Sequence, residues 1–460
     1  MAFLFKINFK KNSYLDLPLQ FSCLTKMSGQ NAKHIGIWTT TSLVMGNMVA
    51  SAMFMLPATL SWYGSISLLG WLLSGLGAIC LALVYSWLSQ LIPIANGGPY
   101  AYTREGLGDF AAFLVAWGYW ISVWCTNAAI AVAFTSYLTV FVPEIGHNPS
   151  FAVGVGLSAI WFLTWINTRG IREAGTVQVI TTILKIAPLV LVTVGGVFYI
   201  HVENYFPFNV SGTTNLSAIS STATLTLFAF LGLECATIPS GRVENPEITI
   251  PRATLVGTLA VTVLYISGTV VIMGVLPPSV LKTSQAPFAD AAASMWGDWA
   301  RYLVAGGAVM STFGALNGWI LMQGQIPAAA AADKLFPSIF KLENKLGSPF
   351  ISIIASSLLV SFLMLMNFNH NLANTYQFII LLSTMTVLVP YLFSMVSYVI
   401  LAVKSKQRKW SNYTKMSIAF LAFIYSMWAV AGSGQEAVYW GFILLMAGVP
   451  LYGWSKMHHL

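Results

Sequence analysis

The stretch TTTSLVMGNMVASAMFMLPATL, residues 39–60, carries no charged side chain. A helix of about 20 apolar residues crosses the hydrocarbon core of a bilayer, so this stretch is long enough to span a membrane. Gly46, Asn47, Ser51 and Pro57 interrupt the apolar run, and such residues weaken a continuous helix. Irregular backbone at membrane depth is tolerated only where it is buried in protein or lines a cavity. The stretch therefore predicts a transmembrane helix that is broken at a cavity.

Apolar blocks of this kind fill the whole chain. Of its 460 residues, 57% are hydrophobic and 8% are charged, whereas a soluble domain carries about 25% charged residues. The blocks are too uninterrupted for the alternating strands of a membrane barrel. We therefore predict an all-α polytopic membrane protein and exclude a soluble enzyme. Twelve transmembrane helices are expected at residues 35–63, 66–92, 108–142, 151–167, 174–200, 218–241, 253–276, 299–330, 349–367, 373–402, 412–431 and 436–455.

The basic residues give the predicted orientation, because cytoplasmic loops are enriched in lysine and arginine. With the N-terminus in the cytoplasm, 19 of the 22 lysines and arginines lie in cytoplasmic segments. Lys282 and Arg301 lie outside, and Lys185 lies within a span. Both termini are therefore expected in the cytoplasm. The net charge of +8 reflects this topology and does not indicate nucleic-acid binding.

Two charged residues lie at membrane depth, where charges are costly and usually mark a path for ions, protons or substrate. Lys185 is about 15 Å from either end of its span, at 1.5 Å per residue, so its side chain cannot reach the interface. It is a candidate proton carrier, or else a permanent cation that holds helix backbones together. Glu234 is a candidate gating or proton-linked group, or else a protonated acid with a structural role.

A second interrupted span contains GLECATIPSG, residues 232–241, five spans after the first. Paired interruptions of this kind predict a substrate site near the membrane midplane of a transporter. Helix N-termini at such a site can bind a carboxylate, and exposed carbonyl groups can bind an ammonium. An amino acid presents both groups. Tyr119 and Asn127 share one face of the third span and could complete a pocket, whereas Trp319 could equally be a packing residue.

The motifs GNMVASAMFMLPATL (46–60), GGPYAY (97–102), FLGLECATIPSGRVENPEITIPRAT (230–254) and GQIPAAAAADKLFP (324–337) resemble the amino acid–polyamine–organocation superfamily. Within it, the chain is most similar to the basic amino acid/polyamine antiporters, especially the arginine–agmatine antiporters. The resemblance runs from about residue 35 to the C-terminus. It implies five-plus-five inverted repeats with discontinuous helices 1 and 6, followed by two further helices.

The resemblance also implies a domain organisation and a set of site residues. Residues 1–34 would be a cytoplasmic tail (with a possible start at Met27), 35–402 the ten-helix transport core, and 403–460 two helices and a short tail. Lys185 and Glu234 would serve proton coupling or gating. The substrate site would comprise Asn47, Ala50, Ser51, Ala52, Tyr119, Ser122, Asn127, Phe228, Cys235, Ala236, Thr237 and Trp319.

Roles within that site follow from the matched motifs. Residues 47–52 would face the substrate carboxylate and residues 235–237 its amino group. Tyr119, Phe228 and Trp319 would be aromatic gates, and Asn127 would recognise the substrate side chain.

The chain departs from the arginine–agmatine antiporters at three places. Residues 50–52 read Ala-Ser-Ala where those proteins have Gly-Ser-Gly, and alanine disfavours the left-handed dihedrals that glycine allows. Phe228 replaces a tryptophan and lacks its N–H donor. Lys185 replaces an apolar residue and looks like the fifth-helix lysine of proton-coupled amino acid transporters, where it stands in for a sodium ion.

These features predict a secondary active amino acid transporter, exchanging an amino acid for an amine or another amino acid by alternating access. A proton-coupled symporter that uses Lys185 is the alternative, and a non-transporting amino acid sensor is a more remote one. The expected partners are the substrate, the lipid bilayer and, by the resemblance, a second copy of the chain. The expected location is the bacterial inner membrane. No catalytic residue, metal site or cofactor is predicted.

Overall fold

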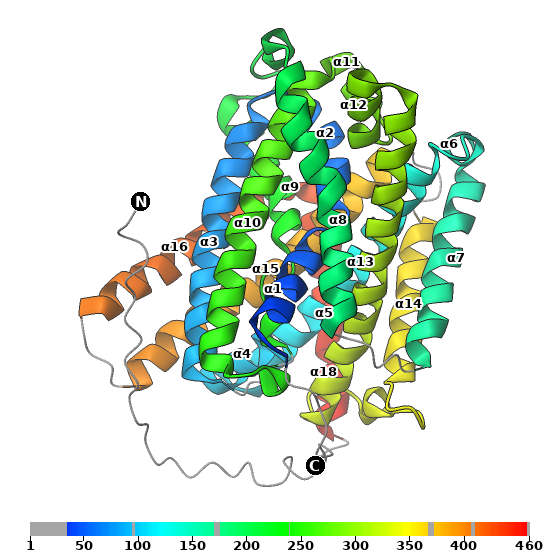
Figure 1. Cartoon of the computed structure of the whole chain (residues 1–460). Helices are drawn as coiled ribbons and strands as arrows, with labels where there is room; N and C mark the ends of the chain where they lie inside the picture. Colours follow the sequence, from blue (N-terminus) through cyan, green and yellow to red (C-terminus); the bar gives the residue numbers. More distant parts are fainter. Residues whose placement is uncertain are drawn as a thin grey trace. The chain divides into compact units, whose positions relative to one another are not determined.

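The computed structural model describes residues 35–93, 97–169, 175–238, 240–366, 372–405 and 410–457. Helices joined by short loops make up this part of the chain, which contains an isolated β-bridge between Ile35 and Val243 and no β-strand (Figure 1). The predicted tail, residues 1–34 with Met27, lies outside the described residues.

The first half of the chain contains α1 (Ile37–Met48), α2 (Ala52–Ser61), α3 (Ser67–Leu91), α4 (Pro99–Leu107), α5 (Asp109–Leu138), α6 (Glu144–His147), α7 (Pro149–Thr168) and α8 (Gly175–Gly196). Two short 3₁₀ turns follow α8, η1 (Val197–Tyr199) and η2 (Val202–Tyr205).

The second half begins with α9 (Asn215–Leu227), followed by the 3₁₀ turns η3 (Phe228–Phe230), η4 (Cys235–Thr237) and η5 (Ser240–Arg242). The remaining elements are α10 (Pro246–Val275), α11 (Pro278–Leu281), α12 (Pro287–Trp296), α13 (Asp298–Ala332), η6 (Ser338–Lys341), α14 (Phe350–Met366), α15 (Leu372–Lys404), α16 (Trp410–Gly432), α17 (Gly434–Met446) and α18 (Gly448–Met457).

Ten helical segments in the described part of the chain are long and apolar enough to cross a membrane, against twelve predicted. The other two predicted spans fall on α8 and α14. Their apolar helical parts, Lys185–Tyr199 and Phe350–Met366, are shorter. The protein is therefore a multi-pass membrane protein of helical class.

One predicted boundary was wrong. The seventh span was expected from residue 253, but α10 starts at Pro246, because proline is well suited to the first turn of a helix. The last span, expected at residues 436–455, is present as the apolar segment Gly434–Met457, in which Ala447 separates α17 from α18. Elsewhere the predicted spans and the helices agree to within a few residues.

The helices differ in how deeply they are packed. α5 contacts both α13 and α15 and is mostly buried, whereas the last two membrane segments are mostly not buried. Phe420 and Phe442 on these outer segments are exposed. Large exposed apolar side chains suit contact with lipid. The core of the protein therefore surrounds α5, and α16 to α18 lie at its periphery.

The first predicted break is present between α1 and α2, at residues 49–51. Val49 has φ −75° and ψ 78°, which ends the helix. The only non-glycine residues with positive φ in the described part of the chain are Asn245 and Lys334. The break therefore needs no left-handed residue, and alanine at positions 50 and 52 fits it without backbone strain.

The second break follows α9, where Gly232 has φ +103°. The residues after it form the 3₁₀ turns η4 and η5, so no α-helix lies between this break and α10 in the described residues. Both the amide and the hydroxyl of Thr237 donate to the Glu234 carbonyl oxygen, at 2.9 and 2.6 Å, and these i→i+3 bonds form a tight turn.

Candidate functional site

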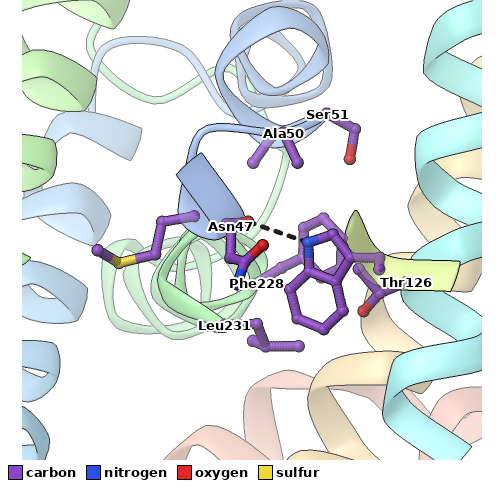
Figure 2. Close-up of a pocket in the computed structure, with 9 residues that line it drawn as sticks. Asn47, Ala50, Ser51, Thr126, Phe228 and Leu231 are labelled. Carbon is purple, nitrogen blue, oxygen red and sulfur yellow. Dashed lines mark hydrogen bonds between the residues drawn. The ribbon is translucent and has the colours of Figure 1, made fainter. Parts of the chain in front are cut away.

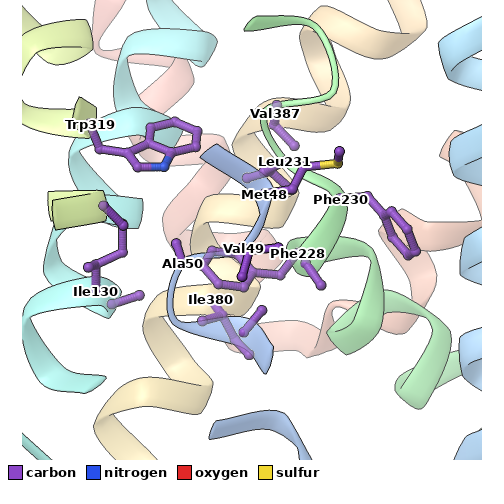
Figure 3. Packing of buried hydrophobic residues seen from close by; sticks show 14 of the residues in the cluster. Met48, Val49, Ala50, Ile130, Phe228, Phe230, Leu231, Trp319, Ile380 and Val387 are labelled. Atoms are coloured by element: carbon purple, nitrogen blue, oxygen red, sulfur yellow. The ribbon is translucent and has the colours of Figure 1, made fainter. Parts of the chain in front are cut away.

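The two breaks lie in van der Waals contact with each other. A Cβ atom at Gly232 would lie 3.2 Å from Asn47 Cβ and 3.4 Å from Trp319 Cζ2. The position combines a left-handed backbone with a crowded environment, and only glycine meets both demands easily. Figure 3 shows residues from both breaks, including Val49, Leu231 and Phe228, together with Trp319. The sequence breaks thus meet at one place in the fold.

Side chains from three helices hold the end of α1. The last carbonyl groups of a helix have no partner within it, and those of residues 46–48 each accept a hydrogen bond from elsewhere. Lys185 Nζ donates to the Gly46 carbonyl at 3.4 Å. Trp319 Nε1 donates to the Asn47 carbonyl at 3.1 Å, and Tyr265 OH donates to the Met48 carbonyl at 2.6 Å. These donors come from α8, α13 and α10, so the break is fixed by tertiary contacts.

A small buried cavity lies at the junction of the breaks (Figure 2). The volume open to the centre of a water molecule is about 10 Å³, so the cavity has room for about one water. The dashed line in Figure 2 marks the hydrogen bond between Trp319 and the Asn47 carbonyl at its edge. The lining residues are Asn47, Met48, Ala50, Ser51, Ala52, Thr126, Phe228, Leu231 and Trp319.

Glu234 lies directly after the second break and is fully buried. Tyr119 OH donates to its Oε1 at 2.7 Å, and Tyr391 OH donates to its Oε2 at 3.0 Å. The two tyrosines come from α5 and α15. The carboxyl group therefore connects the second break to two core helices and has both oxygens hydrogen-bonded.

Lys185 is 4% exposed and points at the first break. Its stem crosses the face of α13 at Gly314, where a Cβ atom would lie 3.3 Å from Lys185 Cε. Within the described residues, no carboxylate lies within 4.0 Å of its ammonium nitrogen. The partner of the lysine is thus the Gly46 carbonyl oxygen and not an acidic side chain.

Polar groups on α5 pair with helices around the cavity. Asn127 Nδ2 donates to Gln323 Oε1 at 2.7 Å, and the Ser122 and Ser383 hydroxyl oxygens are 3.1 Å apart. In the second break, Cys235 Sγ lies 3.6 Å from Met322 Sδ. Asn127, Ser122 and Cys235 are buried, but none of them lines the cavity.

The predicted site residues thus fall into two groups, although the function of each stays a prediction. The residues that line the cavity are Asn47, Ala50, Ser51, Ala52, Phe228 and Trp319. The residues that are buried but do not line the cavity are Tyr119, Ser122, Asn127, Lys185, Glu234, Cys235, Ala236 and Thr237.

Met48, a lining residue, falls within the predicted stretch 47–52, but the sequence analysis missed two others, Thr126 and Leu231. The polar one, Thr126, directly precedes Asn127 in an apolar span, which is a signal that could have found it. Tyr265 and Tyr391 were missed too. Each is one tyrosine among 18 in the chain, and nothing in the local sequence marks either one.

Comparison with known proteins finds transporters of amino acids and amines. A family model described as amino acid permease matches residues 35–451. The putrescine transporter PotE of Haemophilus influenzae is 31% identical over 431 residues, covering 93% of this chain and 98% of that protein. PotE of Escherichia coli is 32% identical over 438 residues, covering 93% and 97%. The cadaverine/lysine antiporter of E. coli is 29% identical over 435 residues, covering 93% and 96%.

These matches extend over nearly the whole chain, including both breaks, and confirm the resemblance predicted from the motifs. The chain belongs to the amino acid permease family, within its group of basic amino acid and polyamine antiporters.

Proposed function

We propose that this protein is a secondary active antiporter that exchanges a basic amino acid for a related diamine or amino acid. The observation that carries the proposal is the meeting of two broken helices around a buried cavity. A site of this kind exposes backbone groups to a substrate at membrane depth. The named relatives carry putrescine, or cadaverine and lysine, which supports a substrate with an amino group at the end of its chain.

The N-terminus of α2 supports binding of the substrate carboxylate. The first amides of a helix have no partner within it, and the helix dipole favours an anion there. Ser51 occupies the N-cap position, and its side chain caps none of these amides. Ser51 and Ala52 both line the cavity. A carboxylate placed there would accept hydrogen bonds from the α2 amides.

The proposed architecture has twelve spans, with five-plus-five inverted repeats and both termini in the cytoplasm. The positions of the two breaks, five spans apart, support the repeat. The distribution of lysine and arginine supports the orientation. Arg301, one of the two basic residues on the proposed outer side, pairs with Asp290 at 3.1 Å and is not part of a basic cluster. The bacterial inner membrane and a homodimer stay predictions.

Counterflow into proteoliposomes tests the exchange. Vesicles preloaded with unlabelled lysine, putrescine, cadaverine or agmatine are diluted into labelled lysine, and empty vesicles with an inward proton gradient serve as the comparison. We expect uptake only into preloaded vesicles, and the best counter-substrate then identifies the exchange pair. Absence of uptake for every amino acid and amine tested would refute the proposal.

Proton-coupled symport is the second candidate, favoured by the contact between Lys185 and the Gly46 carbonyl at the first break. A proton taken up by the amine would strengthen that contact and couple it to the shape of the break. Uptake into empty vesicles that is lost with the proton gradient would indicate symport. Lys185→Ala should then abolish the pH dependence of uptake. Unchanged uptake and unchanged pH dependence in Lys185→Ala would exclude this role.

A further inference from the structure

Asn127 and Gln323 form a buried amide pair between α5 and α13. Both side chains are 0% exposed, and Asn127 Nδ2 donates to Gln323 Oε1 at 2.7 Å. Asn127 follows Thr126 in the sequence, and Gln323 is one helical turn beyond Trp319. Thr126 and Trp319 both line the cavity. The amide pair is therefore next to the cavity wall on both helices.

The neighbours of Gln323 determine which way its amide group points. Its Nε2 donates to the Ser357 hydroxyl at 2.8 Å and to the Ile353 carbonyl oxygen at 3.4 Å, both on α14. A backbone carbonyl can only accept a hydrogen bond, so the glutamine nitrogen must face α14. Its oxygen then faces Asn127, which must in turn present its own nitrogen. The orientation of both amides follows from this chain of bonds.

One consequence is a buried acceptor without a donor. Asn127 Oδ1 has no hydrogen-bond partner among the described residues. A buried polar atom that lacks a partner costs free energy, so nearly all such atoms in proteins are satisfied. Asn127 does not line the present cavity, which holds about one water, but a substrate must enlarge that cavity, and the acceptor is satisfied when the substrate then brings an N–H donor. A hydrocarbon side chain brings none.

We propose that Gln323 is a positioning residue that sets the substrate specificity. It fixes the Asn127 amide so that the asparagine oxygen accepts a hydrogen bond from an ammonium or guanidinium group at the end of the substrate side chain. The inference rests on the proposed transport function and adds a residue to it. Gln323 itself need not contact the substrate.

The test compares two ligands with the same six-carbon chain in the counterflow assay. Lysine carries an ammonium group on the last carbon, and norleucine lacks this group and ends in a methyl group. The measured quantity is the apparent KM of lysine divided by the inhibition constant of norleucine, in wild type and in Gln323→Met. Gln325→Met is the matched control, since Gln325 lies on the same helix and is exposed.

Wild type should prefer lysine, and Gln323→Met should reduce that preference by about ten-fold, which is typical for a lost hydrogen bond to a charged group. The loss should come from a higher apparent KM for lysine, with norleucine inhibition little changed. Gln325→Met should behave as wild type. If Gln323→Met is not recovered as folded protein, Ser357→Ala is the second variant. It removes one of the two bonds that orient the glutamine. It should then lower the preference in the same direction by a smaller factor.

Three results would overturn the inference. One is a wild-type protein that exchanges lysine but binds norleucine equally well, since a water molecule would then satisfy Asn127. Another is an unchanged preference in the variants. The third is an equal weakening of both ligands, which would indicate a purely structural role. Absence of any counterflow in wild type would refute the proposed transport function itself, and is thus distinguishable from these results.

Discussion

Replacing Gly232 with alanine tests whether the two breaks touch as described. The change places a methyl group on a residue with φ +103°, at 3.2 Å from Asn47 Cβ and 3.4 Å from Trp319 Cζ2. Backbone strain in a left-handed non-glycine residue costs about 1–3 kcal/mol. Crowding by one methyl group adds about 1 kcal/mol, because the neighbours must shift by only tenths of an ångström. Alanine also lowers the conformational entropy of the unfolded chain, which offsets about 0.4–1 kcal/mol, so we expect the free energy of unfolding to fall by about 1–3.5 kcal/mol.

Two other glycines separate strain from crowding. Gly212 has φ +71°, and a Cβ atom added there would meet no other atom within 4 Å, so Gly212→Ala adds strain alone. Gly154 lies within α7 in open space and has no positive φ, so Gly154→Ala should leave stability unchanged or slightly raised. Thermal unfolding in detergent, followed by tryptophan fluorescence, should place Gly232→Ala lowest, then Gly212→Ala, then wild type.

The exchange rate of Gly232→Ala should also fall, because the added methyl group pushes on the cavity wall at Asn47 and Trp319. A Gly232→Ala protein that unfolds at the same temperature as Gly212→Ala would show that the contact between the breaks does not exist. One that unfolds no earlier than wild type would also contradict the left-handed backbone at this position.

Two further predictions concern stability. Tyr265→Phe should lower the free energy of unfolding by about 0.5–1.5 kcal/mol, because it removes one of the two donors to the buried Met48 carbonyl and leaves only the Ala50 amide. A melting temperature equal to that of wild type would contradict this role. Asp333→Asn should change stability by less than about 1 kcal/mol, because the Asp333–Arg104 pair, at 3.6 Å, is about a third exposed. A large drop in its melting temperature would show that the contacts of Asp333 with Arg104 and with the Tyr100 hydroxyl, at 2.9 Å, lock the α4 end of the protein.

The sequence predicted the features that the bilayer enforces. Because lipid cannot satisfy backbone groups, apolar runs must be helices, and the predicted spans fall on the observed helices. The same constraint makes an interruption such as Gly46-Asn47 or Gly232 stand out, and makes Lys185 and Glu234 visible as isolated charges. These residues are indeed gathered around the two breaks.

The partners of those residues could not be predicted. Tyr391 and Tyr265 reach the breaks from helices far away in sequence, and their contacts depend on the rotation of each helix, which an apolar span does not encode. Gln323 was missed for the same reason, since its role comes from atoms on α5 and α14. The 3₁₀ turns after Glu234 also depend on hydrogen bonds within the break, which helix propensity does not describe.

The contacts around the cavity indicate which side must move to admit a substrate. A space for one water is too small for an amino acid, so the cavity must enlarge. The end of α1 is held by donors from three helices, at 2.6 to 3.4 Å. At Phe228 the contacts are fewer, because its neighbour Tyr376 makes a single side-chain hydrogen bond to the first break. Phe228 packs edge-on against Tyr376, with ring centroids 6.3 Å apart, and Tyr376 OH lies 3.3 Å from Ser51 Oγ. That distance is long for a bond between hydroxyl groups, which is commonly about 2.7–2.8 Å. We therefore expect the two aromatic rings to yield first, while the first break keeps its shape and presents the α2 amides to the incoming carboxylate.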